Sequence, residues 1–256
     1  MLSWCSYCQQ FQGEVPPFEQ LNITHGLCTD CGIRGIDLSK SELEHAHKLR
    51  DIQRQLMEAG SVEDFGAAER IVDLAIADHV RPVDILFGLV APSLYLIGEE
   101  WRRGSITVCQ EHRFTSFCEK VYELVSEKVM SETARPLRNR RIEALLINAD
   151  GNNHTLAIRM IALWLKSRGV EALALYRSPT PSDLINLLKQ MQPRLLLISI
   201  ALAEQWPSVI RLTELLESIS IENKPKIIIG GYAVKSGMLA PIAGTTLISD
   251  ISHLEV

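Results

Sequence analysis

The chain lacks a strong net charge, a long apolar run and a recognisable export signal. Its 256 residues carry a formal net charge of −5, which gives no general attraction to nucleic acid or to anionic lipid. No apolar run approaches the roughly 18–20 residues that a membrane-spanning helix needs. The N-terminus lacks the basic start and apolar core of a signal peptide. We therefore expect a cytoplasmic protein without a membrane segment or a direct nucleic-acid-binding surface.

Internal repeats and low-complexity tracts are also absent, and the composition is that of an ordinary globular protein. Hydrophobic residues make up 46% of the chain and charged residues 22%, which is typical of soluble domains. A chain of 256 residues is long enough for two compact domains and a small appendage.

Four of the six cysteines lie near the N-terminus as two CxxC pairs, Cys5 with Cys8 and Cys28 with Cys31. In the cytoplasm, thiols and metal ligands are more common than disulfides. Two CxxC pairs can complete a tetrahedral four-thiolate zinc site. Residues 1–36 are therefore predicted to form a small zinc-ribbon-like segment, with a redox-active dithiol and chance clustering as the alternatives.

Residues 39–130 show the three- to four-residue spacing of apolar side chains that is typical of amphipathic helices. Gly60 and Ser61 are expected to end the first helix, and later helices are expected at Val62–His79, from Pro82 to Gly104, and at Thr107–Met130. Pro82 suits the first position of a helix, whereas Pro92 predicts a kink. Four helices with short connections predict a four-helix bundle, in which Cys109 and Cys118 are expected to be buried.

A polar, basic stretch at 131–141 is expected to link this bundle to a second domain at 142–256, where strands and helices alternate. Strands are expected at Ile142–Ala149, Val170–Leu175, Arg194–Leu202, Pro225–Ile229 and Thr245–Ile248, and helices at Asn153–Arg168, Ser182–Met191, Ala203–Ser218 and Lys235–Leu239. The strands are apolar on both faces, as a parallel sheet requires. The fold class is therefore α/β: a helical cap followed by a flavodoxin-like, doubly wound, Rossmann-like domain, whose ligand should bind at the carboxyl ends of the strands.

Polar and glycine residues stand at or near those carboxyl ends. Gly151-Asn152-Asn153-His154 follows the first strand, Ser199 lies within the third, and Gly230-Gly231 follow the fourth. In this pattern the domain resembles the cobalamin-binding family of corrinoid photoreceptors and methyl carriers. The resemblance implies that His154 displaces the benzimidazole base of cobalamin and ligates cobalt, and that the nucleotide tail passes Ser199 and the two glycines. Neutral imidazole is a good ligand for a transition-metal ion.

The helical half resembles the cap of light-responsive cobalamin regulators. Trp101, Val108, Glu111 and His112 stand in a W-x2-G-x3-V-x2-E-H pattern. The resemblance implies that they enclose the upper ligand of cobalt, commonly adenosyl, so adenosylcobalamin is the expected cofactor. Tryptophan would supply a flat apolar lid, and Glu111 and His112 would supply polar contacts to a ribose-like group. Packing of these residues within the bundle is the alternative.

Three positions depart from the family pattern. Asn152 stands where a carboxylate usually orients the axial histidine, Ala157 where the loop usually closes on glycine, and Arg102 where some photoreceptors have a second histidine. An amide at position 152 can accept a hydrogen bond from imidazole, but it lacks the charge that raises ligand basicity. These changes favour a protein that only binds cobalamin over a methyl carrier whose cobalt must cycle.

The leading hypothesis is a cobalamin-binding regulatory sensor, responsive to light, that is not an enzyme. Nothing in the sequence resembles a helix-turn-helix with basic recognition residues, so a regulatory protein partner is expected, and homo-oligomer formation stays open. The alternatives are a corrinoid methyl carrier that serves separate methyltransferases, a haem-binding sensor with the same fold, and an interaction module with an empty pocket.

Overall fold

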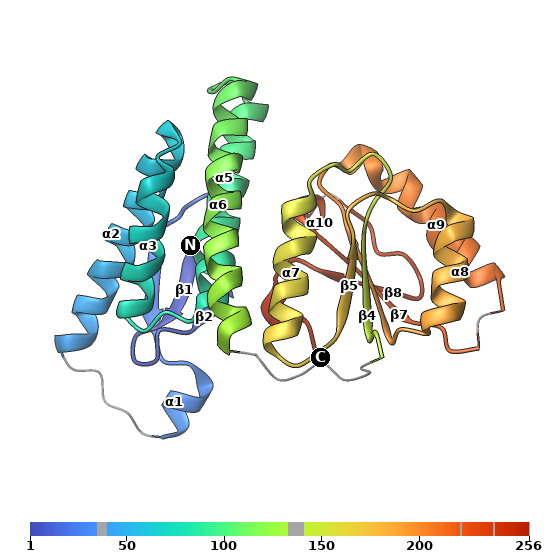
Figure 1. The fold of residues 1–256 in the computed structure, drawn as a ribbon, viewed down its shortest axis with the longest axis horizontal. Coiled ribbons are helices and arrows are strands. Elements are labelled where there is room, and N and C mark those ends of the chain that lie inside the picture. Colours follow the sequence, from blue (N-terminus) through green and yellow to red (C-terminus); the bar gives the residue numbers. More distant parts are fainter. Residues whose placement is uncertain (35–39, 133–140, 221, 238, 256) are drawn as a thin grey trace. The chain divides into compact units, whose positions relative to one another are not determined.

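The computed structural model describes residues 1–34, 40–132, 141–220, 222–237 and 239–255. Two compact units make up the chain, Met1–Ala134 (unit 1) and Arg135–Val256 (unit 2) (Figure 1). The division falls inside the predicted linker at 131–141, of which residues 133–140 lie outside the described part of the chain. The predicted start of the first helix, at residue 39, also lies outside it.

The N-terminal part of unit 1 is a small sheet followed by a short helix. Its elements are β1 (Leu2–Cys5), β2 (Phe11–Glu14), β3 (Ile23–Gly26) and α1 (Thr29–Ile33), with the strand order β2-β1-β3. The central strand β1 runs antiparallel to β2 and parallel to β3. Leu2 and Trp4 of β1 are fully buried, and the Trp4 ring packs against the ring of Phe11 with their centroids 5.2 Å apart.

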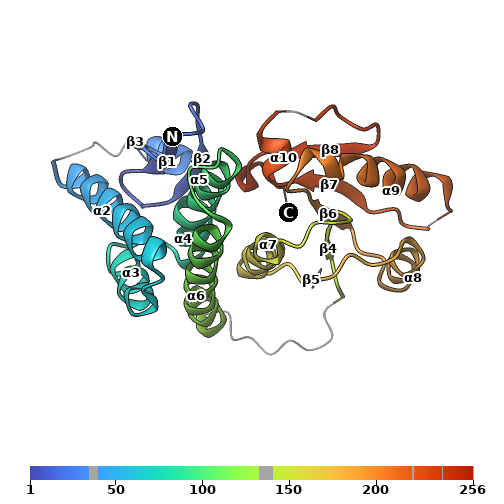
Figure 2. The ribbon, with the colours of Figure 1, turned by 90° about the horizontal axis from the view of Figure 1, so that it is seen from above.

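Four long helical segments follow in the described part of unit 1, as predicted. They are α2 (Lys40–Val62), α3 (Phe65–Ala77), the consecutive segments α4 (Pro82–Ile85), η1 (Leu86–Val90) and α5 (Ala91–Arg102), and α6 (Val108–Glu132). Helix α6 packs against α2, α3 and α5 (Figure 2). The predicted helix break at Gly60 is wrong, because α2 continues to Val62. Glycine is needed there for packing, since a Cβ would stand 2.5 Å from the ring of Phe114 on α6.

The third of these segments contains a π-helical turn, Leu86–Val90, in which the N–H of Ala91 donates to the carbonyl oxygen of Leu86. The irregularity predicted at Pro92 is therefore a π-helical turn just before the proline. Proline has no N–H to donate to the carbonyl four residues earlier, and its ring crowds that carbonyl, so the backbone widens just before it. Gly88 lies within the turn, and a Cβ at this position would overlap the indole of Trp4.

The expectation that no apolar stretch is long enough to span a membrane needs correction. The continuous helix Pro82–Arg102 has 21 residues and a mean hydropathy of 1.3, which passes that test by length and composition. Half of this stretch is buried inside the structure. Its apolar residues therefore have a packing role within unit 1, and the cytoplasmic location stays a prediction.

The two cysteines of α6 differ in exposure. Cys118 is fully buried, as predicted, but the prediction of burial is wrong for Cys109, which is exposed. The first residue of α6 that is buried in the core is Phe114. Cys109 precedes it and lies before the part of the helix that packs against its neighbours.

Unit 2 is a five-stranded parallel sheet with strand order β5-β4-β6-β7-β8. Its elements are β4 (Ala144–Asn148), α7 (Thr155–Ser167), β5 (Ala172–Leu175), α8 (Pro181–Met191), β6 (Leu195–Ser199), η2 (Ala203–Gln205), α9 (Trp206–Ser218), β7 (Lys226–Gly230), α10 (Tyr232–Lys235), β8 (Thr245–Ile248) and η3 (Ile251–His253). Helix α7 lies on one side of the sheet, and α8 and α9 lie on the other (Figure 1). This arrangement confirms the predicted α/β fold.

Alternate side chains of the strands divide between the two faces of the sheet. Leu145 and Ile147 of β4 join the hydrophobic cluster with α8 and α9, so Asn148 points to the face that carries α7. By the same alternation, Ile198 faces α8 and α9 while Ser199 faces α7. The polar ends of β4 and β6 thus lie on the same face.

The short helix after the fourth strand is placed differently from the prediction. It was expected at Lys235–Leu239, and the structure has it at Tyr232–Lys235, directly after β7. Gly231 makes this early start possible because its φ of +110° is a conformation that other residues rarely adopt. The chain therefore turns from strand into helix at one residue, which the apolar pattern did not indicate.

Candidate functional site

The loop between β4 and α7 places His154 at the carboxyl edge of the sheet of unit 2. His154 is the N-cap residue of α7, and its side chain is exposed. The imidazole makes no hydrogen bond or ion pair with any residue that the structure describes. The N–H of Asn152 donates to the carbonyl oxygen of Ala149 (2.9 Å), and Gly151 has a φ of +78°, so the loop is a tight turn. An imidazole held in this way is accessible to a metal ion from solvent.

The register of the sheet brings the other predicted residues next to this loop. Asn148, at the end of β4, pairs with Ser199 at the end of β6, and Ser199 pairs with Gly230 at the end of β7. Ser199 is only 7% exposed. Three neighbouring strands thus end at the same level, with an amide, a hydroxyl and a glycine in a row.

The two glycines have structural roles of their own. A Cβ at Gly231 would overlap the carbonyl oxygen of Ile200, so the close approach of these two backbone segments requires glycine. A Cβ at Gly230 would stand 3.1 Å from the carbonyl oxygen of Ile248. The backbone therefore requires glycine at position 231 even without a ligand, and it leaves little room for a side chain at position 230.

Residues that sequence reasoning missed lie at the same edge. Tyr176 follows β5 and is 58% exposed, and Leu202 follows β6 and is 45% exposed. Large apolar side chains that are exposed beside a functional loop suit a flat, mostly apolar ligand. Their position within three residues of the end of an apolar strand was the signal that could have identified them.

A cavity of about 500 Å³ also lies in unit 2, on the α8 and α9 side of the β4 loop. It is lined by the loop residues Asn148–Asp150, the start of α8 and one face of α9. His154, Ser199 and the glycine pair are not among its lining residues. This cavity therefore shares Asn148 with the row of residues at the strand ends, but not Ser199 or Gly230.

The four residues predicted to cover the upper ligand lie where α5 ends and α6 begins. Trp101 is 46% exposed and Val108 is 51% exposed. Oε1 of Glu111 accepts a hydrogen bond from the hydroxyl of Thr115 (2.9 Å), and Nε2 of His112 lies 3.5 Å from Oε2 of Glu111. Unit 1 thus presents an exposed indole together with a carboxylate and an imidazole that contact each other.

The four N-terminal cysteines converge, as their spacing predicts. The sulfur atoms of Cys5, Cys8, Cys28 and Cys31 all lie within 4.8 Å of one another, and all four residues are free thiols. A tetrahedral zinc site with Zn–S bonds of about 2.3 Å has sulfur atoms about 3.8 Å apart, and Sγ of Cys8 lies 3.8 Å from Sγ of Cys28. The cluster therefore has dimensions that fit one zinc ion.

The electrostatics of the cluster also fit a cation. Burial raises the pKa of the Cys5 thiol, but hydrogen bonds with the backbone at Cys8, Cys28 and Tyr7 outweigh it and lower that pKa to about 7. Burial, together with the neighbouring thiols, raises the pKa of Cys31 to about 12. A bound metal ion would supply a positive charge that favours the thiolate forms of these cysteines.

The cysteine segment is anchored to the helices of unit 1. The Trp4 indole lies against Gly88 in the π-helical turn. The N–H of Phe11 donates to Oδ2 of Asp84 (3.3 Å), a buried carboxylate that also accepts two hydrogen bonds from Arg81 (2.7 and 2.9 Å). The segment thus packs against the continuous helix Pro82–Arg102, which carries Trp101 near its end.

Similar sequences and structures are found among proteins that bind corrinoids. Residues 62–125 match the family model described as B12 binding domain, and they extend from the end of α2 into α6. The monomethylamine corrinoid protein of Methanosarcina barkeri has a similar structure, with a TM-score of 0.64 and 16% sequence identity, over 78% of this chain and 93% of that protein.

Two further solved structures match less well. A cobalamin-binding protein from Desulfitobacterium hafniense DCB-2 has a TM-score of 0.39 and 18% identity, over 71% of this chain and 83% of that one. The methanol:cobalamin methyltransferase complex of Methanosarcina barkeri has a TM-score of 0.38 and 12% identity, over 88% and 89%. No curated protein matches the chain significantly. The chain therefore shares its fold with a corrinoid protein, and its match to the B12 binding domain lies in the helical unit.

Proposed function

We propose that this chain is a cobalamin-binding protein in which the imidazole of His154 ligates the cobalt ion. The observation that carries the proposal is the exposed, unpartnered imidazole at the carboxyl edge of the sheet, beside Ser199 and Gly230. The B12 binding domain match of residues 62–125 and the fold shared with a corrinoid protein support it. When bound, cobalamin would supply a cobalt centre with an exchangeable upper ligand.

Each group of residues has a defined task in this proposal. His154 donates the lone pair of one ring nitrogen to the metal. Ser199 and Gly230 border the path of the nucleotide tail, and Tyr176 and Leu202 offer apolar surface to the macrocycle. Trp101 and Val108 of unit 1 would supply apolar contacts to an upper ligand, and Glu111 and His112 would supply polar contacts to a ribose-like group. None of these residues is assigned a catalytic role.

A regulatory role, with light as the signal, is the function that we favour for the bound state. Asn152 and Ala157 replace the carboxylate and the glycine of the carrier-type loop, and both changes suit a protein that binds cobalamin without cycling it. The output would pass through a protein partner. A corrinoid methyl carrier is the second candidate, because the fold extends over 78% of this chain in a monomethylamine corrinoid protein.

The four cysteines are proposed to hold a structural zinc ion. The sulfur spacing fits a tetrahedral site, and three of the four side chains are buried. Structural zinc sites use four protein ligands, whereas catalytic sites keep one position open. The ion would therefore stabilise the N-terminal sheet against the helices.

Reconstitution with defined cobalamins tests the proposal. The full chain is mixed with hydroxo-, methyl- or adenosylcobalamin, freed of unbound cofactor, and examined by absorbance in the dark and after illumination. The wild type should retain about one cobalamin per chain with a protein histidine as lower ligand. His154→Ala should lose that ligand, while Asn153→Ala, an exposed neighbour in the same loop, should behave as the wild type.

The same preparation separates the candidate roles. A change of spectrum and of oligomeric state on illumination supports the sensor. Reduction followed by methylation from a methyltransferase partner supports the carrier. A haem Soret band that survives competition with cobalamin supports the haem-binding alternative. Absence of any cobalamin binding, or binding that is indifferent to His154→Ala, contradicts the proposed function.

A further inference from the structure

Two buried asparagines lie beside the backbone of His154. Asn148 is the last residue of β4 and is 1% exposed, and Asn152 lies in the following loop and is 4% exposed. Buried amide groups destabilise a protein unless their donors and acceptors are satisfied. The partners of these two side chains therefore indicate what the side chains do.

The two side chains hold both backbone polar groups of His154. The N–H of His154 donates to Oδ1 of Asn152 (3.0 Å), and Nδ2 of Asn148 donates to the carbonyl oxygen of His154 (3.4 Å). Nδ2 of Asn152 donates to the carbonyl oxygen of Ser199 (3.0 Å) and to Oδ1 of Asn148 (3.5 Å). This asparagine clamp, Asn148 with Asn152, ties the residue that begins α7 to the ends of β4 and β6.

We infer that Asn148 and Asn152 are positioning residues for the cobalt ligand, and that they act on the backbone of His154 and not on its ring. The inference rests on the proposed cobalamin binding. Oδ1 of Asn152 accepts a hydrogen bond from the backbone N–H of His154. A side chain at position 152 would have to give up this bond in order to reach the imidazole ring. The two asparagines thus fix the backbone of His154, and the imidazole ring itself is left exposed to solvent.

The chemistry of the clamp explains why position 152 carries an amide. The side chain at this position donates to the carbonyl oxygen of Ser199 and accepts from the N–H of His154 at the same time. An ionised carboxylate is an acceptor only, so Asn152→Asp would lose the bond to Ser199 and place an anion against a carbonyl oxygen. The amide therefore satisfies two backbone groups that an ionised carboxylate could not satisfy together.

Loss of either asparagine should loosen the ligand without removing it. Groups that orient a metal ligand typically change metal affinity by about 10- to 100-fold when they are mutated. We expect Asn152→Ala and Asn148→Ala to reduce the fraction of bound cobalamin with histidine as lower ligand, and to weaken cobalamin binding by about 10-fold or more. Asn152→Asp should also reduce the fraction with histidine as lower ligand and weaken cobalamin binding, as Asn152→Ala does.

Electron paramagnetic resonance of the full chain loaded with cob(II)alamin provides the test. A nitrogen ligand splits the cobalt signal into three lines with ¹⁴N and into two with ¹⁵N, so protein labelled with ¹⁵N-histidine shows whether His154 or the cofactor's own base is bound. Amide hydrogen exchange at His154 in the cofactor-free protein measures the clamp independently. Asn153→Ala is the matched control and should leave the line pattern and the exchange rate unchanged.

The outcomes distinguish this inference from the proposed function. A two-line signal in labelled wild type that turns to three lines in His154→Ala supports cobalamin binding through His154, whatever the asparagines do. If Asn148→Ala and Asn152→Ala then keep the two-line signal and the wild-type affinity, the clamp does not position the ligand. A wild type that shows no histidine splitting refutes the proposed function itself. Faster exchange at His154 together with an unaltered line pattern indicates a purely structural clamp and also overturns the inference.

Discussion

The two candidate metal sites of this chain differ in how complete the protein makes them. The cysteine cluster of unit 1 gathers four sulfur atoms within 4.8 Å, and most of them are buried. The site in unit 2 offers a single exposed imidazole at the end of a strand. A complete set of protein ligands couples metal binding to folding. A single protein ligand can bind only a metal whose other ligands belong to a cofactor. The first arrangement suits a structural ion, and the second suits a cofactor.

The supporting contacts follow the same division. The cysteine segment is fixed by large buried groups, Trp4 against Gly88 and Asp84 against Phe11 and Arg81. The backbone N–H and C=O of His154 are held by the side chains of Asn152 and Asn148, and the side chain of His154 is left exposed. Mutations should therefore change folding in unit 1 and ligand binding in unit 2.

Loss of the cysteine site should give the largest effect on stability. Cys31→Ser removes one buried thiolate, and we expect loss of the metal and destabilisation of unit 1 on the order of 5 kcal/mol, because structural zinc contributes roughly 10–16 kcal/mol of binding free energy in small zinc domains. Calorimetric unfolding with metal analysis by atomic emission checks this. Cys109→Ser, an exposed thiol outside the cluster, should leave both readings unchanged. Retention of the metal by Cys31→Ser would show that the cluster does not need all four cysteines to bind it, contrary to the difference drawn between the two sites.

An added methyl group at Gly88 should have the next largest effect. The Cβ of Gly88→Ala would overlap the Trp4 indole, and overpacking of this kind destabilises by about 1–3 kcal/mol. Thermal unfolding should show a lower midpoint for unit 1 and no change for unit 2. Gly98→Ala in α5 is the matched control, because a Cβ there meets nothing within 4 Å and alanine favours a helix by about 0.8–1 kcal/mol. Equal stability of the two variants would show that Trp4 does not anchor the segment.

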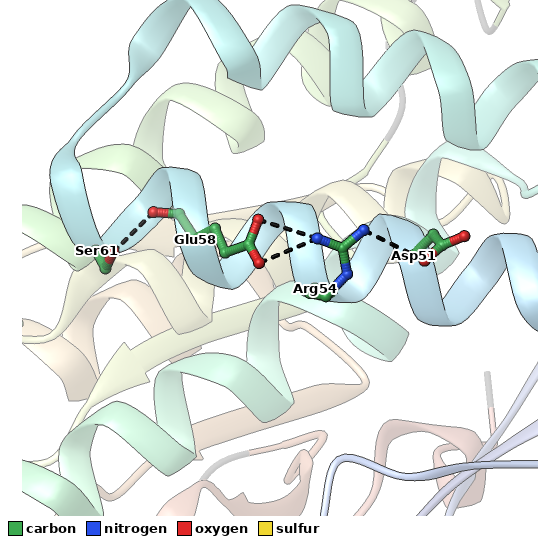
Figure 3. Close-up of polar contacts among 4 residues, drawn as sticks. All are labelled: Asp51, Arg54, Glu58 and Ser61. Carbon is green, nitrogen blue, oxygen red and sulfur yellow. Dashed lines mark hydrogen bonds and ion pairs between the residues drawn. The ribbon is translucent and has the colours of Figure 1, made fainter.

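A surface ion pair should have the smallest effect. Arg54 of α2 contacts Glu58 at 3.0 Å and Asp51 at 3.4 Å (Figure 3). All three side chains are exposed, so solvent screens these ion pairs and they contribute little to stability. In thermal unfolding, Arg54→Ala should lower the stability of unit 1 by much less than Gly88→Ala does, and by less still in high salt. A larger loss would show that surface charge contributes to unit 1 as much as buried packing.

Much of the fold was predictable because it depends on local patterns. The strands Leu195–Ser199 and Lys226–Gly230 are apolar on both faces, which only a buried parallel sheet accommodates. The cysteine cluster followed from the spacing of its two pairs. The positions of His154, Ser199 and Gly230 at one edge followed from the rule that parallel strands end together.

The remaining features depend on contacts between distant residues. The place of Gly60 inside α2 is decided by Phe114, and the glycine in the π-helical turn is matched to Trp4 from the other end of the unit. The hydrogen bond from Asn152 to the carbonyl oxygen of Ser199 joins residues 47 positions apart and became visible only once the sheet was formed. The exposure of Cys109 depends on where α6 begins to pack. None of these is a property of a residue and its immediate neighbours.

The π-helical turn decides which way the exposed indole at the far end of its helical segment faces. A turn of this type adds one residue to the helix, so every later side chain is rotated by about 100° relative to an uninterrupted α-helix. Trp101 lies on the same continuous helix, beyond the turn Leu86–Val90. Deletion of a single residue within that turn would therefore redirect the tryptophan while leaving its immediate surroundings in the sequence intact.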